Sequence, residues 1–308
     1  MIGDRRRVGI ALALGAAVIS GVSVYLNAMA VRAFGDPILY TTIKNSIAAA
    51  LLVGLALAWT ARRPAAGLTR PRNIRQIAGL GVIGLFGGGA AFVLFFEGLA
   101  RTSASSAGFI QKTLVLWVAI LAVSFLRERF GAMHVAAIGL LVAGQIVASG
   151  GSAMPAFSTG EMLIFAATLL WAVEVIVAKW LLSGLSPLTV ASGRMGIGGV
   201  ALIAFTLATG HVATLASLGA GQWAWVLLTG VILTLYVATW FAALARAQAT
   251  DVTAMLVFGA VITAVLSSGG QLAALAPGAV GLALIAAGTV AVFVLATRSQ
   301  GLVRKPQV

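Results

Sequence analysis

The sequence consists almost entirely of apolar runs about 20 residues long, separated by short polar breaks. Charged residues make up 9% of the chain, whereas soluble domains carry about 25%. About 20 apolar residues are enough to cross a bilayer as a helix. Inside lipid, only helices and closed barrels satisfy every backbone polar group. The sequence therefore predicts an all-α integral membrane protein.

Ten such runs can be recognised. The first begins at Val8 behind a basic N-terminus and is too long for the apolar part of a signal peptide, so we expect it to be a retained transmembrane helix. The ten predicted spans are 8–29, 37–59, 76–100, 103–125, 131–149, 160–181, 187–209, 222–245, 251–270 and 277–297.

Part of the sequence is written twice. The segment FEGLAR at 96–101 returns as FAALAR at 241–246, 145 residues later. A proline followed seven residues later by a basic residue also occurs twice, as Pro37 with Lys44 and as Pro187 with Arg194. We predict two five-helix repeats, 1–150 and 151–308, in one membrane domain. Because five is odd, the second repeat must enter the membrane from the opposite face, which gives an inverted repeat around a central cavity.

The net charge of +13 is concentrated in the predicted loops. With both termini in the cytoplasm, the outer side receives only Arg32 and Arg101, as the positive-inside rule requires. We expect this basic collar to contact a lipid bilayer with anionic head groups, and we expect no nucleic-acid partner. The cytoplasmic set is Arg5, Arg6, Arg7, Arg62, Arg63, Arg70, Arg72, Arg75, Arg127, Arg129, Lys179, Arg246, Arg298, Arg304 and Lys305.

The duplication, the proline–basic pattern and the FxxLAR segments resemble the drug/metabolite transporter superfamily. Within it, the chain is similar to EamA-type proteins and to bacterial exporters of amino acids, including aromatic ones. Glu128, just after the fourth span, is a further feature of the family, but the second half has no acid at 269–274. The resemblance implies ten helices around a cavity, alternating access, and export from the cytoplasm across the bacterial inner membrane.

Five ionisable residues lie well inside predicted spans, where an unpaired charge is costly and usually functional: Lys44, Glu97, Lys112, Glu174 and Arg194. Lys44 and Glu97 fall in the outer third of the membrane, and Glu174 and Arg194 in the inner third. This depth pattern predicts an outer and an inner gate, or coupling groups. Glu174 and Arg194 are alternatively a purely structural pair.

Simpler interpretations exist for the other three. Lys44 alternatively snorkels to the outer interface, and Glu97 pairs with Arg101 one helical turn away. Lys112 lies near mid-membrane on the fourth span, where it either snorkels or binds a substrate carboxylate.

Aromatic residues at mid-span positions are candidates to bind a small-molecule substrate by stacking. Trp171 shares a helix face with Glu174, and Tyr236 shares one with Trp240. Core packing is the alternative for all of them. The predicted substrate-binding set is Tyr25, Lys112, Trp117, Trp171, Tyr236 and Trp240.

The glycines of spans three and seven, including Gly87 to Gly89, predict close helix packing or a bend during gating. The chain has no cysteine, its two histidines are isolated near span ends, and it has no Walker-type loop. We therefore expect no enzyme activity, cofactor or metal. The predicted function is secondary export of amino acids, preferably aromatic or hydrophobic ones, and related small metabolites. The alternatives are a drug or nucleotide-sugar carrier, a membrane-embedded enzyme acting on lipids, and a structural helper subunit.

Overall fold

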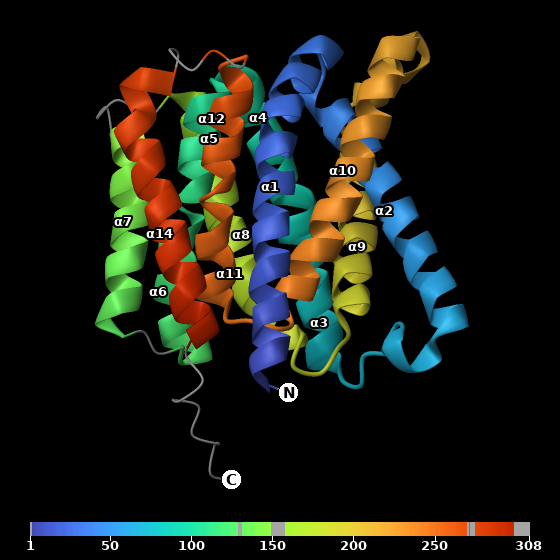
Figure 1. Ribbon diagram of the computed structural model, residues 1–308. Coiled ribbons are helices and arrows are strands. Elements are labelled where there is room, and N and C mark those ends of the chain that lie inside the picture. Colours follow the sequence, from blue (N-terminus) through green and yellow to red (C-terminus); the bar gives the residue numbers. More distant parts are fainter. Residues whose placement is uncertain (1, 129–130, 149–157, 270, 272–274, 299–308) are drawn as a thin grey trace.

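The computed structural model describes residues 2–128, 131–148, 158–269, 271 and 275–298, and these residues form a bundle of helices without a strand. Figure 1 shows that α1 begins and α14 ends at the same end of the bundle, which we call the terminal end. The predicted boundary at 150, and the predicted loop cations Arg129, Arg304 and Lys305, lie outside the described residues.

The long helices run back and forth between the two ends. Short 3₁₀ segments at Pro64–Ala66 (η1), His211–Ser217 (η3) and Ala276–Gly278 (η4) lie between them. The helices are α1 (Ile2–Phe34), α2 (Pro37–Arg62), α3 (Ile74–Val82), the π-helical η2 (Ile83–Ala90), α4 (Ala91–Arg101), α5 (Ala104–Lys112), α6 (Leu114–Leu126), α7 (Ala132–Ala148), α8 (Thr159–Leu181), α9 (Pro187–Ala208), α10 (Ala220–Leu244), α11 (Ala249–Leu256), α12 (Gly259–Ser267) and α14 (Ala279–Arg298).

In the described residues, nine helices are long and apolar enough to cross a membrane. They correspond to nine of the ten predicted spans. The predicted span 131–149 is represented by α7, which is apolar but shorter, with 17 residues. The chain is thus a multi-pass membrane protein, while the count of ten stays a prediction.

The repeated prolines begin helices, which explains why that pattern recurs. Pro37 and Pro187 each occupy the first turn, where the missing N–H has no intrahelical acceptor to lose. The residue before each proline is the cap. Asp36 accepts from the backbone N–H groups of Ile38 and Leu39, and Ser186 accepts from that of Thr189.

The helices of the two predicted repeats pack mainly against each other. α2 lies on α9 and α7 on α14, while α1 packs on α10 and α4 on α8. The fourth and ninth spans each contain a break, after Lys112 and after Leu256, and approach each other through α6 and α11. The core of the molecule is therefore built between the repeats.

Candidate functional site

A cavity of about 90 Å³ lies in the middle of the bundle. Its walls come from α1, α2, α4, α5, α6, α8, α9, α10 and α11. Its lining residues are Ser20, Ser23, Val24, Asn27, Lys44, Phe92, Phe95, Phe96, Gln111, Lys112, Leu114, Trp171, Glu174, Val175, Arg194, Leu233, Tyr236, Val237, Trp240, Phe241, Thr253 and Leu256.

Glu174 and Arg194 form a buried ion pair at this cavity. Arg194 Nη2 donates to Glu174 Oε2 at 3.0 Å, and Arg194 Nε donates to the other carboxylate oxygen. The two side chains are 6–7% exposed. A bidentate arginine–carboxylate contact of this kind fixes both groups in one plane. The pairing expected from their matched depth is present.

A backbone carbonyl completes the environment of the pair. The oxygen of Gly87 accepts from Arg194 Nη2 and from Trp171 Nε1, both at 3.1 Å. Gly87 lies in the π-helical segment η2, in which the wider i→i+5 bonding disturbs the regular ladder. A Cβ at Gly87 would overlap the Glu174 carboxylate, so glycine is required for this approach. The glycine run therefore helps to build the site.

Lys44 is enclosed by aromatic rings although it has no carboxylate partner among the described residues. Its Nζ lies 3.5 Å from the centroid of the Phe96 ring, 5.2 Å from that of Tyr40 and 5.4 Å from that of Phe92. The side chain is 1% exposed, and Nζ donates to Asn27 Oδ1 at 3.3 Å. Ring faces attract cations in this arrangement. Snorkelling to the interface, the simpler interpretation, does not describe this buried side chain.

Lys112 reaches the same cavity from the break between α5 and α6. Its Nζ donates to Ser20 Oγ at 3.0 Å and lies 3.4 Å from Gln111 Oε1. The side chain is 4% exposed and has no carboxylate partner in the described part of the chain. Lys112 therefore faces inward.

One face of α1 contributes polar groups that sequence reasoning missed. Ser20, Ser23 and Asn27 line the cavity, and Asn27 Nδ2 donates to the carbonyl and hydroxyl oxygens of Ser23. Asn27 Oδ1 also lies 2.6 Å from the hydroxyl of Tyr40. The signal was available in the sequence, because small polar residues at i, i+3 and i+7 of an apolar span share one helix face.

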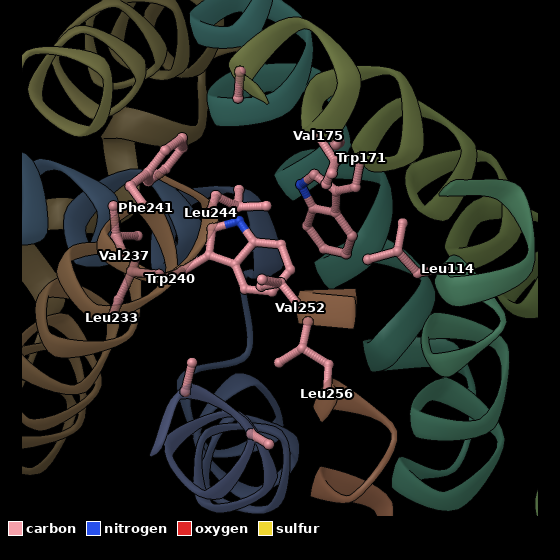
Figure 2. Packing of buried hydrophobic residues seen from close by; sticks show 14 of the residues in the cluster. Leu114, Trp171, Val175, Leu233, Val237, Trp240, Phe241, Leu244, Val252 and Leu256 are labelled. Atoms are coloured by element: carbon pink, nitrogen blue, oxygen red, sulfur yellow. The ribbon is translucent and has the colours of Figure 1, made fainter. Parts of the chain in front are cut away.

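Three of the predicted aromatic residues line the cavity. Trp171 on α8 and Trp240 on α10 project into the same space between the helices, as Figure 2 shows. Tyr236 stacks on Trp240 with ring centroids 6.0 Å apart. On the other side, Trp171 meets Phe92 edge-on. The cavity wall thus combines aromatic rings with buried charged side chains.

The other predicted site residues do not line the cavity. Trp117 packs edge-on against Phe165 and donates to Thr113 Oγ1. Glu97 is paired with Arg101 on the same helix, one turn away. Tyr25 is partly buried on α1, outside the lining. The position of these residues along a span indicated their depth in the membrane. Their position around the helix axis, which directs each side chain away from the cavity, was not predicted.

Polar contacts also link distant segments at the two ends of the bundle. At the terminal end, Glu128 accepts from the backbone N–H groups of Ala249 and Thr250, which begin α11. Nearby, the buried carboxylate of Asp251 accepts from Arg6 Nη2 at 2.8 Å. Glu128 therefore caps the ninth span, which gives the acidic family position a structural role.

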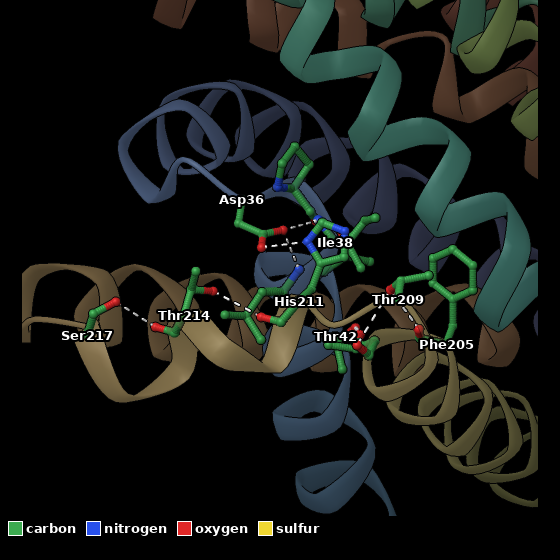
Figure 3. Close-up of polar contacts among 12 residues, drawn as sticks. Asp36, Ile38, Thr42, Phe205, Thr209, His211, Thr214 and Ser217 are labelled. Carbon is green, nitrogen blue, oxygen red and sulfur yellow. Dashed lines mark hydrogen bonds and ion pairs between the residues drawn. The ribbon is translucent and has the colours of Figure 1, made fainter.

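At the opposite end, His211 of η3 lies beside Asp36, the cap of α2, with Nδ1 2.7 Å from Oδ2 (Figure 3). His134 Nε2 lies 3.8 Å from Asp251 at the terminal end. The histidines that look isolated in the sequence are therefore each next to an aspartate. Within the described ranges, no three metal-ligating side chains gather at one point.

A family model described as "EamA-like transporter family" matches residues 7–150 and 158–295. The uncharacterized transporter YyaM of Bacillus subtilis (strain 168) is 29% identical over 149 residues, 47% of this chain and 48% of the relative. The match thus spans about half the length of that curated relative.

A solved chain described only as "Crystal structure of protein" has the same fold. The likeness has a TM-score of 0.66 and 19% sequence identity, and it covers 94% of this chain and 99% of that one.

Proposed function

Since the chain belongs to the EamA-like transporter family, we propose that this membrane transporter exports amino acids and related small carboxylate metabolites, with aromatic and hydrophobic ones preferred. The observation that carries the proposal is the cavity, in which buried cations and aromatic rings line one space. The cations are suited to a carboxylate, and the faces of Trp171, Tyr236 and Trp240 to an apolar or aromatic side chain.

The size of the cavity favours small substrates. At the roughly 30 Å³ that a water molecule takes in the liquid, the cavity of about 90 Å³ has room for about three waters, which is far too little for a nucleotide sugar. Larger ligands would need a wider opening than this conformation has.

We propose further that the two halves form an inverted repeat that works by alternating access. Equivalent helices begin 145 residues apart, as Ala104 and Ala249 do, and as Leu114 and Gly259 do. The contacts also occur in exchangeable pairs. Gly9 of α1 packs against Arg246, and Gly160 of α8 packs against Arg101. Such pairs support a pseudo-twofold relation between the halves.

The Glu174–Arg194 pair is proposed as the gate at the terminal end, which we assign to the cytoplasm. Each residue is seven positions from the nearer helix end, and the pair joins α8 to α9 and, through Gly87, to η2. Lys44 takes the corresponding position on α2 near the opposite end.

We propose the bacterial inner membrane as the location, with the basic loops facing anionic lipid.

Transport into proteoliposomes tests the function. Vesicles preloaded with one unlabelled amino acid should accumulate the same labelled amino acid from outside by exchange, with phenylalanine, tryptophan and leucine as the first panel. Empty vesicles and the Trp240→Ala variant serve as controls. Exchange no faster than in empty vesicles for every amino acid would refute the proposal, and exchange of a nucleotide sugar instead would favour the alternative carrier.

A further inference from the structure

The charges that face the cavity do not balance. Among the described lining residues three are basic, Lys44, Lys112 and Arg194, and one is acidic, Glu174. The single carboxylate is already held by Arg194 through two hydrogen bonds. Two ammonium groups therefore face the cavity without a carboxylate partner in the described residues.

Both ammonium groups keep hydrogen-bonding capacity for a ligand. An ammonium has three N–H donors. Lys44 Nζ makes one hydrogen bond to a described residue, to Asn27, and Lys112 Nζ makes two, to Ser20 and Gln111. At least one donor on each lysine remains for an oxygen that enters the cavity.

By contrast, the one carboxylate that lines the cavity among the described residues, which could pair with a positively charged ligand, is already in use. Glu174 is bound by Arg194, and the rings of Tyr40, Phe92 and Phe96 surround the Lys44 ammonium. An ammonium group on the ligand would meet the like charges of Lys44, Lys112 and Arg194 in this poorly solvated space. A zwitterion carries such a group, whereas a simple carboxylate does not.

The two lysines contact α1 at different depths. Ser20 and Asn27 are seven residues apart, a rise of about 10 Å along the helix. Lys112 and Lys44 are therefore two separate binding points for a negative group, one near mid-span and one nearer the end where α2 begins.

We infer that the cavity selects substrates with net negative charge, such as a 2-oxo acid with an apolar side chain, over the zwitterionic amino acid with the same side chain. The ligand is an organic acid whose carboxylate is held by Lys112 or Lys44 and whose side chain lies against the rings of Trp171 and Trp240. This inference rests on the proposed function and, within the proposed substrates, ranks the carboxylate metabolites above the amino acids.

The charge preference can be tested with three ligands that share a phenyl ring and differ in charge. They are the anion phenylpyruvate, the zwitterion phenylalanine and the cation phenethylamine. Their binding to the purified full chain is measured as thermal stabilisation over a concentration series. We expect phenylpyruvate to bind at least tenfold more tightly than phenylalanine, and phenethylamine to bind weakest. Equal or tighter binding of phenylalanine, or no binding of phenylpyruvate, would overturn the inference.

Lysine variants test the cause of the preference. Lys112→Met and Lys44→Met should each weaken phenylpyruvate binding by tenfold or more and change phenylalanine binding less, whereas the Lys→Arg variants should keep most of the preference. Unchanged phenylpyruvate binding in both Met variants would also overturn the inference.

Exchange in proteoliposomes is a separate measurement. Failure of exchange for all ligands would refute the proposed export. The binding series would still decide whether the cavity prefers negatively charged ligands.

Discussion

At the scale of single residues, the site depends on the backbone carbonyl oxygen of Gly87, which accepts two hydrogen bonds from side chains. Trp171 and Arg194 come from different helices, and both donate to the carbonyl oxygen of Gly87. Trp171 therefore has two roles, because its ring lines the cavity and its N–H holds η2 in place. These roles can be separated by substitution.

Replacing Trp171 by alanine should lower exchange of tryptophan and phenylalanine several-fold more than exchange of threonine, because the wall for an aromatic side chain is lost. Trp171→Phe keeps a ring but removes the N–H donor to Gly87. We expect this matched variant to keep the preference for aromatic substrates with reduced thermal stability. Equal losses for all three amino acids in both variants would identify Trp171 as a packing residue only.

The buried ion pair gives a second prediction at this scale. Glu174→Gln leaves Arg194 without its counter-charge in a buried place, and breaking such a pair costs about 3–5 kcal/mol. Glu174→Leu combined with Arg194→Leu leaves no lone charge, so this double variant should melt closer to the unchanged protein than Glu174→Gln does. Melting is followed in detergent by circular dichroism.

Transport separates a gate from a structural pair. If the pair is the gate, the double leucine variant should fold and yet exchange substrate at no more than about a tenth of the normal rate. Normal exchange by that variant would show that the gate lies elsewhere.

At the scale of helices, the third span depends on close backbone contact with α9. A Cβ at Gly88 would meet the carbonyl oxygen of Arg194 and the Cα of Gly198, which belong to backbone and cannot turn aside. Gly81, on the same span, has open space around the corresponding position. These two glycines make a matched pair of probes.

Gly88→Ala should destabilise the protein by about 1–3 kcal/mol, because overpacking forces the two helices apart. Gly81→Ala should be neutral or stabilise by up to about 1 kcal/mol, since alanine is the better helix former. Comparison of their melting temperatures in one detergent checks this. A Gly88→Ala protein as stable as Gly81→Ala would contradict the close approach of η2 and α9.

The helices also indicate what the sequence could predict. Span positions followed from apolar length, and the contact of Glu174 with Arg194 followed from equal depth on consecutive helices. The cage around Lys44 did not follow, because it needs rings from α4 and an amide from α1 in one place. Each residue turns a helix by about 100°, so depth alone leaves the facing direction open.

Glu97 illustrates the same limit. Its depth predicts a role beside Lys44, whereas its spacing of four residues predicts the pair with Arg101, and the structure confirms the pair. The sequence also could not predict the π-helical turns of η2, because a glycine run is compatible with several helix types. In the structure, this segment packs closely against Glu174 and Arg194.

At the scale of the whole molecule, the exposed side chains of the bundle are largely apolar. Large apolar groups on several helices are more than half exposed, which suits contact with lipid tails. They include Leu55, Leu57, Phe125 and Leu235. With the basic loops gathered at the terminal end, this surface predicts one orientation in the bilayer.

Single cysteines test that orientation in the otherwise cysteine-free chain. Thr159→Cys and Ala213→Cys, exposed at the end opposite the termini, should react with an impermeant thiol reagent added to intact cells. Ala65→Cys and Ser183→Cys, exposed at the terminal end, should react only after the cells are opened. The reverse labelling pattern would place the termini outside and contradict the proposed gate assignment.

The ion pair has a consequence for biosynthesis. Glu174 and Arg194 lie on neighbouring helices joined only by residues 182–186, so they leave the ribosome within a few seconds of each other. A lone charge at the centre of an inserting helix costs roughly 2.5–3.5 kcal/mol, whereas a hairpin can enter with both charges matched. In an insertion assay, α8 alone should integrate less efficiently than α8 followed by α9, and Arg194→Leu should remove the advantage. The Glu174–Arg194 contact, which we assign to the gate of the mature transporter, would then also act during synthesis, because it lets α8 and α9 insert into the membrane together as one hairpin.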